Sequence, residues 1–118
     1  MTNLIEKANE VLEVMQRDWD RWCDRSHMGD ETRNTQKFTF EVRRNFIKFI
    51  QGRDNGQRSV NGFLVLNPPK GTDNKTNQPF QVGDLLMAKS WDQPSKNFAR
   101  GNVFKEGWER NIRWTGVL

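Results

Sequence analysis

The stretch that decides the fold class is Asn3-Leu-Ile-Glu-Lys-Ala-Asn-Glu-Val-Leu-Glu-Val-Met-Gln-Arg-Asp-Trp-Asp-Arg-Trp22. Its apolar residues recur at spacings of three and four, so they share one face of an α-helix. These residues are Leu4, Ile5, Ala8, Val11, Leu12, Met15, Trp19 and Trp22. Asn3 followed by Glu6 fits a capping box, and Gly29 fits a helix end near Met28. The pattern predicts one long amphipathic helix within residues 1–30.

After this helix the apolar residues change to a period of two, which is typical of β-strands. Phe38, Phe40 and Val42 alternate with polar residues that start at Lys37, so one face of this strand is apolar. Further strands are predicted at 46–50, 58–66 and 80–89, with shorter ones at 102–104 and 112–117. Between the second and third strands, Asp54-Asn55-Gly56 predicts the tight turn of a hairpin.

The order of these elements predicts a single α+β domain over residues 1–118. Residues 1–30 are expected to be helical and residues 36–118 mainly β, with the long N-terminal amphipathic helix packed on a mainly antiparallel β-sheet. Prolines, a glycine and polar residues dominate residues 67–79, which predicts an exposed loop. The edges of so small a sheet are usually protected or paired, so we expect a homodimer or a higher homo-oligomer.

The charge of the chain is divided unevenly along its length. Residues 1–31 carry eight acidic and four basic residues, whereas the rest of the chain carries fifteen basic and seven acidic residues. An anionic ligand is therefore expected to meet the second part. The chain has no long apolar run and no signal-peptide pattern, so we expect a cytoplasmic protein that does not span a membrane.

The sequence lacks the motifs of common enzyme classes. With Cys23 as the only cysteine and His27 as the only histidine, it predicts no disulfide, no metal-ligand cluster and no cofactor. The nucleophile, Walker and dinucleotide-binding glycine motifs are all missing. His27 is expected in the last turn of the helix, and Asp18, Asp20 and Asp24 on its solvated outer face. These features predict a binding protein and not an enzyme.

Candidate ligand-binding residues concentrate between residues 80 and 104, where basic and aromatic side chains alternate. Arginine offers phosphate two parallel hydrogen bonds, an aromatic ring stacks on a base, and asparagine can read a base edge or a ribose hydroxyl. On this reasoning the ligand-binding residues are Arg58, Lys89, Trp91, Asn97, Phe98, Arg100 and Asn102. Trp108 and Trp114 are expected to be packing residues. A nucleotide carries all of these groups, namely phosphate, a base and a ribose, so it would fit these residues.

Part of the chain, roughly residues 46–116, resembles a class of small bacteriophage proteins. The resemblance rests on Phe46-Ile-Lys-Phe-Ile50, Gln57-Arg-Ser-Val-Asn-Gly-Phe63, Gly83-Asp-Leu-Leu-Met-Ala-Lys-Ser-Trp91, Asn97-Phe-Ala-Arg-Gly-Asn-Val-Phe104 and Arg113-Trp-Thr-Gly116. Within that class the chain is similar to the Thoeris anti-defence proteins of the first type. The resemblance implies a non-enzymatic sponge, which sequesters a cyclic ADP-ribose signal made by host TIR-domain enzymes. Related chains often have a lysine directly after the tryptophan, where this chain has Asp92.

Two other functions use the same kinds of residue. A nucleic-acid strand would also be bound by cations and exposed aromatic rings, and the sequence pI of about 9.6 is compatible with that ligand. An inhibitor that docks on a host protein is the third possibility. The shape of the site separates them, because a recessed pocket near Arg58 and Arg100 favours a small ligand and a long basic groove favours nucleic acid.

Overall fold

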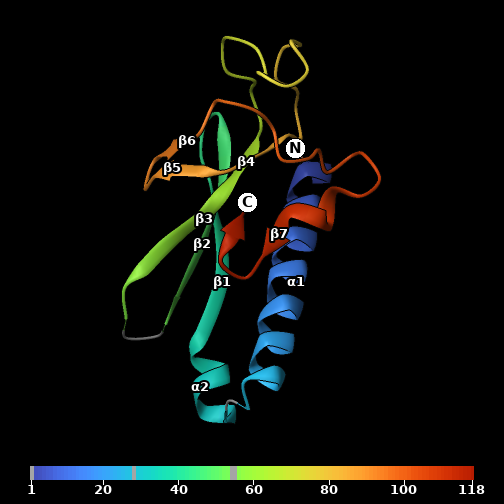
Figure 1. Cartoon of the computed structure of the whole chain (residues 1–118). Coiled ribbons are helices and arrows are strands. Elements are labelled where there is room, and N and C mark those ends of the chain that lie inside the picture. Colours follow the sequence, from blue (N-terminus) through green and yellow to red (C-terminus); the bar gives the residue numbers. More distant parts are fainter. Residues whose placement is uncertain (1, 28, 54–55) are drawn as a thin grey trace.

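The computed structural model describes residues 2–27, 29–53 and 56–118. A long helix, α1 (Thr2–Arg25), lies alongside a four-stranded antiparallel sheet, and two small β-hairpins follow in the C-terminal part (Figure 1). The predicted α+β class, with a long N-terminal helix packed on a mainly antiparallel sheet, is therefore confirmed. None of the helices described combines the length and the apolar character that a transmembrane span needs.

The four-stranded sheet has the order β1-β2-β3-β4. Its strands are β1 (Gln36–Val42), β2 (Phe46–Arg53), β3 (Arg58–Val65) and the short β4 (Leu85–Leu86). A short helix, α2 (Asp30–Thr35), leads into β1. The remaining elements are β5 (Ala88–Ser90), β6 (Gln93–Pro94), the 3-10 helix η1 (Trp108–Asn111), β7 (Ile112–Arg113) and β8 (Gly116–Val117). Strands β5 and β6 form one hairpin, and β7 and β8 form the other.

The main core lies between α1 and one face of the sheet. From the helix, Leu4, Val11 and Met15 are buried, and they belong to one cluster with Ile47 and Phe49 of β2. Removing such side chains from water contributes about 1.5–3 kcal/mol each. The predicted apolar face of the helix is confirmed, although Ile5, Leu12 and Trp22 are only half-buried.

The ends of α1 differ from the sequence prediction. The helix begins at Thr2, so Asn3 lies inside it and is not the N-cap, and it ends at Arg25 and not near Met28, which lies outside the described residues. His27 follows the helix in the left-handed conformation with φ 55°, so it is not in the last turn. Gly29 serves instead as the N-cap of α2, a helix that was not predicted. A tertiary contact supports α2, because Trp19 Nε1 donates a hydrogen bond to the carbonyl of Arg33 (3.0 Å).

The region after β3 contains less strand than predicted. Only Leu85–Leu86 and Ala88–Ser90 are strands within the predicted 80–89, and at 102–104 a single bridge joins Asn102 to Asp84. The reason is the left-handed Gly83 (φ 91°), which turns the chain just before β4. The strands predicted in 112–117 are confirmed as β7 and β8.

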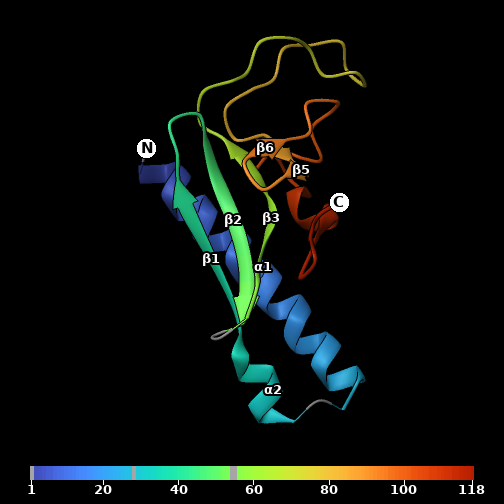
Figure 2. The same ribbon diagram turned by 90° about the vertical axis from the view of Figure 1, so that its left-hand side faces the viewer.

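The structure also bears on two predicted connections, the hairpin turn at 54–56 and the loop at 67–79. At the predicted hairpin turn, the N–H of Gly56 bonds the carbonyl of Arg53 (3.1 Å), while Asp54 and Asn55 lie outside the described residues. Residues 67–79 form the expected, mostly exposed loop, but Asp73 within it is buried. Figure 2 shows this loop projecting beyond one end of the sheet.

Candidate functional site

The residues predicted to bind a ligand separate into clusters, of which the first surrounds Trp91. The Cζ of Arg58 lies 5.7 Å from the centroid of the Trp91 ring, and the Nζ of Lys48 lies 3.8 Å from it. Lys48 is buried, with 1% of its surface exposed, and its Nζ pairs with Asp92 Oδ1 at 2.6 Å. Trp91 itself is 41% exposed. This ring therefore already has two cationic neighbours from the sheet, and part of it remains open to a ligand.

The second cluster surrounds Phe98. The Cζ of Arg100 lies 3.8 Å from the centroid of the Phe98 ring, and the Nζ of Lys75 lies 4.2 Å from it. Asn97 lies beside them, where its Oδ1 accepts a hydrogen bond from the N–H of Phe98 (2.6 Å). Lys75 comes from the loop at 67–79 and was not predicted to belong to any site. The loop thus contributes a cation to this cluster.

The other two predicted residues have different surroundings. Lys89 is exposed on β5 and makes no ion pair with any residue that the structure describes. Asn102 is buried, and its side chain bonds Val82, Asp84 and the N–H of Phe104. These bonds use its amide and its oxygen, so Asn102 stabilises the chain around Gly83 and is not free to read a base. No ring contact, ion pair or hydrogen bond within the described residues connects the Trp91 cluster to the Phe98 cluster.

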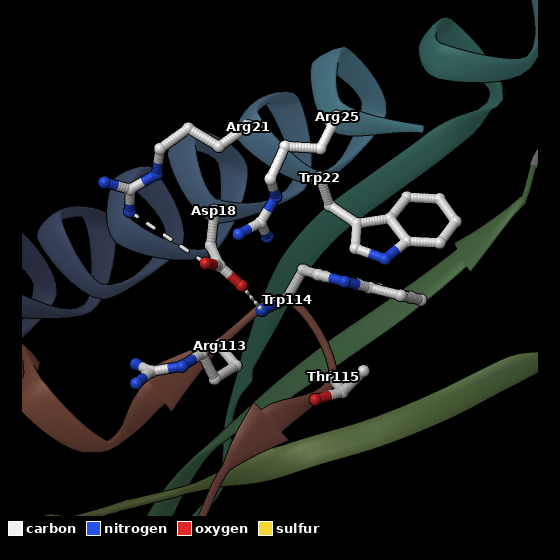
Figure 3. A pocket seen from close by; sticks show the side chains of 7 residues that line it. All are labelled: Asp18, Arg21, Trp22, Arg25, Arg113, Trp114 and Thr115. Atoms are coloured by element: carbon white, nitrogen blue, oxygen red, sulfur yellow. Dashed lines mark hydrogen bonds and ion pairs between the residues drawn. The ribbon is translucent and has the colours of Figure 1, made fainter. Parts of the chain in front are cut away.

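A third site, which the sequence did not predict, is a pocket lined by basic and aromatic side chains. It has a volume of about 510 Å³ and lies between the C-terminal half of α1 and the β7–β8 hairpin (Figure 3). Its lining residues are Asp18, Arg21, Trp22, Arg25, Arg113, Trp114 and Thr115. We refer to this site as the Trp22–Trp114 pocket.

The two indole rings that line the pocket are positioned by a third tryptophan. Trp19 is buried, stacks on Trp22 (centroids 5.3 Å apart) and meets Trp114 edge to face (4.8 Å). The rings of Trp22 and Trp114 are 5.4 Å apart. Figure 3 shows these two rings on one side of the pocket and the three guanidinium groups on the other. Such a division suits a ligand that is aromatic at one end and anionic at the other.

The charges in the Trp22–Trp114 pocket favour an anion. Arg21, Arg25 and Arg113 are opposed by one carboxylate, that of Asp18, which leaves a formal charge of +2. Asp18 Oδ2 accepts a hydrogen bond from the N–H of Trp114 (2.9 Å), and its Oδ1 lies 3.9 Å from Arg21 Nη2. Asp18 therefore connects α1 to the β7–β8 hairpin and is not simply a solvated charge, as had been expected.

The sequence carried one signal for this pocket. The dipeptide Arg-Trp occurs twice, at Arg21-Trp22 and at Arg113-Trp114, and both copies line the pocket. Arg25 follows Arg21 by four residues, which places both on one face of the helix. Residues 1–31 are acidic overall, so Arg21 and Arg25 were not considered as ligand-binding residues. Only the fold brings Arg113 close to them. Trp114 does pack as predicted, but it also lines the site.

Comparison of the chain with protein families, with curated proteins and with solved structures found no match. Among the described residues, no three His, Cys, Asp or Glu side chains form a group that could hold a metal ion. The chemistry of the pocket and of the two aromatic clusters is therefore what bears on function.

Proposed function

We propose that this protein is a non-enzymatic sponge, which binds and sequesters a nucleotide of the cyclic ADP-ribose type. In this proposal a bacteriophage encodes the protein, and it acts in the host cytoplasm to block anti-phage defence. The observation that carries the proposal is the Trp22–Trp114 pocket, where three arginines face two indole rings in a volume of about 510 Å³. Sites for small molecules commonly have volumes of about 300–1,000 Å³.

The chemistry of such a nucleotide matches the lining of the pocket. A diphosphate carries about two negative charges, and the three arginines with Asp18 give the pocket a formal charge of +2. The planar fork of a guanidinium group can donate two parallel hydrogen bonds to a phosphate. The indole rings of Trp22 and Trp114 offer stacking surfaces for the adenine ring.

The lining of the pocket favours binding over hydrolysis. General acid–base catalysis needs a titratable side chain that can reach the reacting group. The only acidic group in the lining is Asp18, and one of its oxygens already accepts the N–H of Trp114. We therefore expect the nucleotide to be released intact when the loaded protein is heat-denatured. A cleaved product formed faster than in a protein-free control would contradict the sponge.

The proposed site is tested by titration calorimetry with cyclic ADP-ribose isomers. Arg113→Ala removes one guanidinium from the pocket, and a hydrogen bond to a charged group contributes about 1.5–3 kcal/mol, so the affinity should fall about tenfold or more. The control is Lys70→Ala, since Lys70 is exposed on the loop at 67–79 and should leave the affinity unchanged. Lys75 is not a suitable control, because its Nζ lies 4.2 Å from the Phe98 ring centroid.

A second variant tests the sign of the electrostatic effect. Asp18→Asn keeps an oxygen that can accept the N–H of Trp114 but removes the negative charge of the pocket. The affinity for the anionic ligand should therefore rise severalfold at low ionic strength, and the gain should shrink as salt is added. Unchanged or weaker binding would mean that the anionic group does not sit near Asp18.

Two further variants test whether the ligand binds at one of the predicted clusters instead. Arg58→Ala changes the Trp91 cluster and Arg100→Ala changes the Phe98 cluster. If either variant weakens binding tenfold while Arg113→Ala does not, the ligand occupies that cluster and not the Trp22–Trp114 pocket.

A nucleic-acid strand is the second candidate ligand, and the two separate cation–aromatic clusters favour it. Trp91 and Phe98 each lie beside two cations, as an extended strand with several bases would require. A short single-stranded oligonucleotide, titrated over a range of salt concentrations, tests this candidate. If the oligonucleotide binds, the cyclic nucleotide does not, and Lys70→Ala weakens binding as much as Arg113→Ala, nucleic-acid binding replaces the sponge.

A further inference from the structure

Strand β1 forms an open edge of the sheet. It pairs with β2 and with no other strand that the structure describes. Figure 2 shows β1 running along the outer side of the sheet over its whole length. An edge strand of seven residues offers a row of main-chain donors and acceptors to a second strand.

The main-chain groups that face this edge can be identified from the hydrogen bonds to β2. The N–H of Arg43 bonds the carbonyl of Phe46 (2.8 Å), so the odd-numbered residues of β1 exchange hydrogen bonds with β2. In an antiparallel pair, successive residues direct their N–H and C=O groups to opposite sides of the strand. The even-numbered residues, which are Gln36, Phe38, Phe40 and Val42, therefore direct theirs toward the open edge.

We infer that β1 is the interface of a twofold-symmetric homodimer, in which it pairs antiparallel with β1 of a second copy and Thr39 lies on the twofold axis. This register pairs all seven residues of β1. It also places even-numbered residues opposite even-numbered ones, so the outward main-chain groups form about eight hydrogen bonds. The inference does not depend on the proposed nucleotide ligand.

The charges on β1 match this register. Lys37 and Glu41 each lie two residues from Thr39 in sequence. Lys37 of one copy therefore lies opposite Glu41 of the second copy, and Glu41 of the first copy lies opposite Lys37 of the second. Both are in non-hydrogen-bonded pairs, where the side chains of neighbouring strands come closest. Within the described chain, Lys37 has no ion-pair partner, while Glu41 already contacts Arg43 (2.9 Å) and Arg58 (3.8 Å). The dimer thus gives Lys37 of each copy an ion-pair partner, so the interface contains two Lys37–Glu41 pairs.

The other face of β1 matches the register as well. Phe38 of one copy lies opposite Phe40 of the second copy, and such aromatic cross-strand pairs stabilise sheets. Both rings are only half-buried in the single chain, and the neighbouring Val42 is 48% exposed. Pairing of the edges covers part of this apolar surface.

Charge reversal at the edge tests the inference. The wild-type protein should sediment as a dimer, and Lys37→Glu should raise the dimer dissociation constant about tenfold or more, since two attractive pairs become repulsive. Adding Glu41→Lys to this variant restores opposite charges and should recover at least part of the affinity. Lys70→Glu is the matched control, because it reverses an exposed charge on the loop at 67–79. All four proteins should bind the same nucleotides, since neither Lys37 nor Glu41 lines the Trp22–Trp114 pocket.

A cysteine cross-link tests the register itself. Thr39→Cys places two thiols in one non-hydrogen-bonded pair, about 4.5–5.5 Å apart at Cβ, so mild oxidation should form a covalent dimer. Cys23 is fully buried and should give no background. Lys37→Cys is the control, because its copies would lie about 13 Å apart along the strands and should not cross-link.

Three results would overturn the inference. The first is a wild-type protein that remains monomeric at every concentration tested. The second is a dimer whose dissociation constant is unaffected by Lys37→Glu, which would place the interface elsewhere. The third is cross-linking of Lys37→Cys as fast as that of Thr39→Cys, which would exclude the register.

Discussion

At the scale of single residues, Asp73 shows how a buried carboxylate orders a polar loop. Its Oδ1 accepts the N–H groups of Lys75 (2.7 Å) and Thr76 (3.2 Å), and its Oδ2 accepts the N–H of Ala99 (2.7 Å). Burial by itself raises the pKa of Asp73, but the three N–H donors and the nearby Lys75 lower it, and the net pKa lies below the ordinary value. The carboxylate thus holds Lys75 close to Phe98 and connects the loop to residues 97–99.

Asp73→Asn is expected to destabilise the protein at neutral pH. The amide cannot accept all three N–H groups as well as a carboxylate does, and bonds to a charged acceptor are the stronger ones, so we expect a loss of about 1–3 kcal/mol. Urea unfolding measures this difference. The control is Glu106→Gln, an exposed carboxylate, which should change the free energy of unfolding little.

The pH dependence of that difference follows from the lowered pKa of Asp73. A carboxyl with a folded pKa below its unfolded value stabilises the fold fully above the unfolded pKa, which is about 3.9 for Asp. This contribution is lost as the pH falls through the folded pKa. The gap in stability between wild type and Asp73→Asn should therefore narrow below about pH 4. A gap that stays constant with pH would mean that the charge of Asp73 is unimportant.

At the scale of elements, strand β3 is shaped by a bulge. Phe49 pairs with Gly62 but Ile50 pairs with Val60, so Asn61 is an extra residue in β3. Gly62 has φ 146°, and a Cβ at this position would lie 2.7 Å from Cγ2 of Val117 in β8. The bulge thus lets the C-terminal hairpin approach the sheet closely.

Gly62→Ala should therefore destabilise the protein by roughly 2–4 kcal/mol, through the clash with Val117 and the unfavourable φ. Denaturant unfolding, followed by tryptophan fluorescence, measures the change. Gly71→Ala is the matched control, because Gly71 also has a positive φ (100°) but no atom within 4 Å of the added Cβ, so it lacks the clash. If both substitutions have the same small effect, the close approach of β8 is not important for stability.

At the scale of the whole molecule, the first helix, α1, is in direct contact with the last hairpin, β7–β8. The bond from the N–H of Trp114 to Asp18 joins residues that are 96 positions apart. Cys23 lies one turn beyond Trp19 on the same helix and is 0% exposed. Its thiol therefore reports whether α1 remains packed.

Labelling of Cys23 by a thiol reagent should require the helix to separate from the rest of the molecule. We expect the native protein to react about a hundredfold or more slowly than the urea-unfolded chain, because packed elements open rarely. Stopped-flow absorbance with a chromogenic disulfide measures both rates. If opening is global, Gly62→Ala should speed up labelling by the same factor by which it raises the equilibrium constant of unfolding. Rapid labelling of the native wild type would show instead that the end of α1 opens independently.

The sequence was sufficient for features that depend on local patterns. A helix repeats every 3.6 residues and a strand every two, so the spacing from Leu4 to Trp22 and the alternation from Lys37 to Val42 identified α1 and β1 directly. Chain order then predicted the α+β class, which the structure confirms. The sequence also shows that the chain carries cations and aromatic rings, the residue types that a phosphate and a base ring would require.

Only the tertiary structure decided which of those residues meet. It separated Arg58 from Arg100, and it gave the amide of Asn102 a structural role. It also brought Arg113 and Trp114 to Trp22, which the acidic composition of the helix had concealed. The physical reason is that a contact between distant residues depends on turns, bulges and packing, such as the left-handed His27 and Gly83. Local periodicity carries no information about these long-range contacts. They are set by the way the helix and the strands pack around the core.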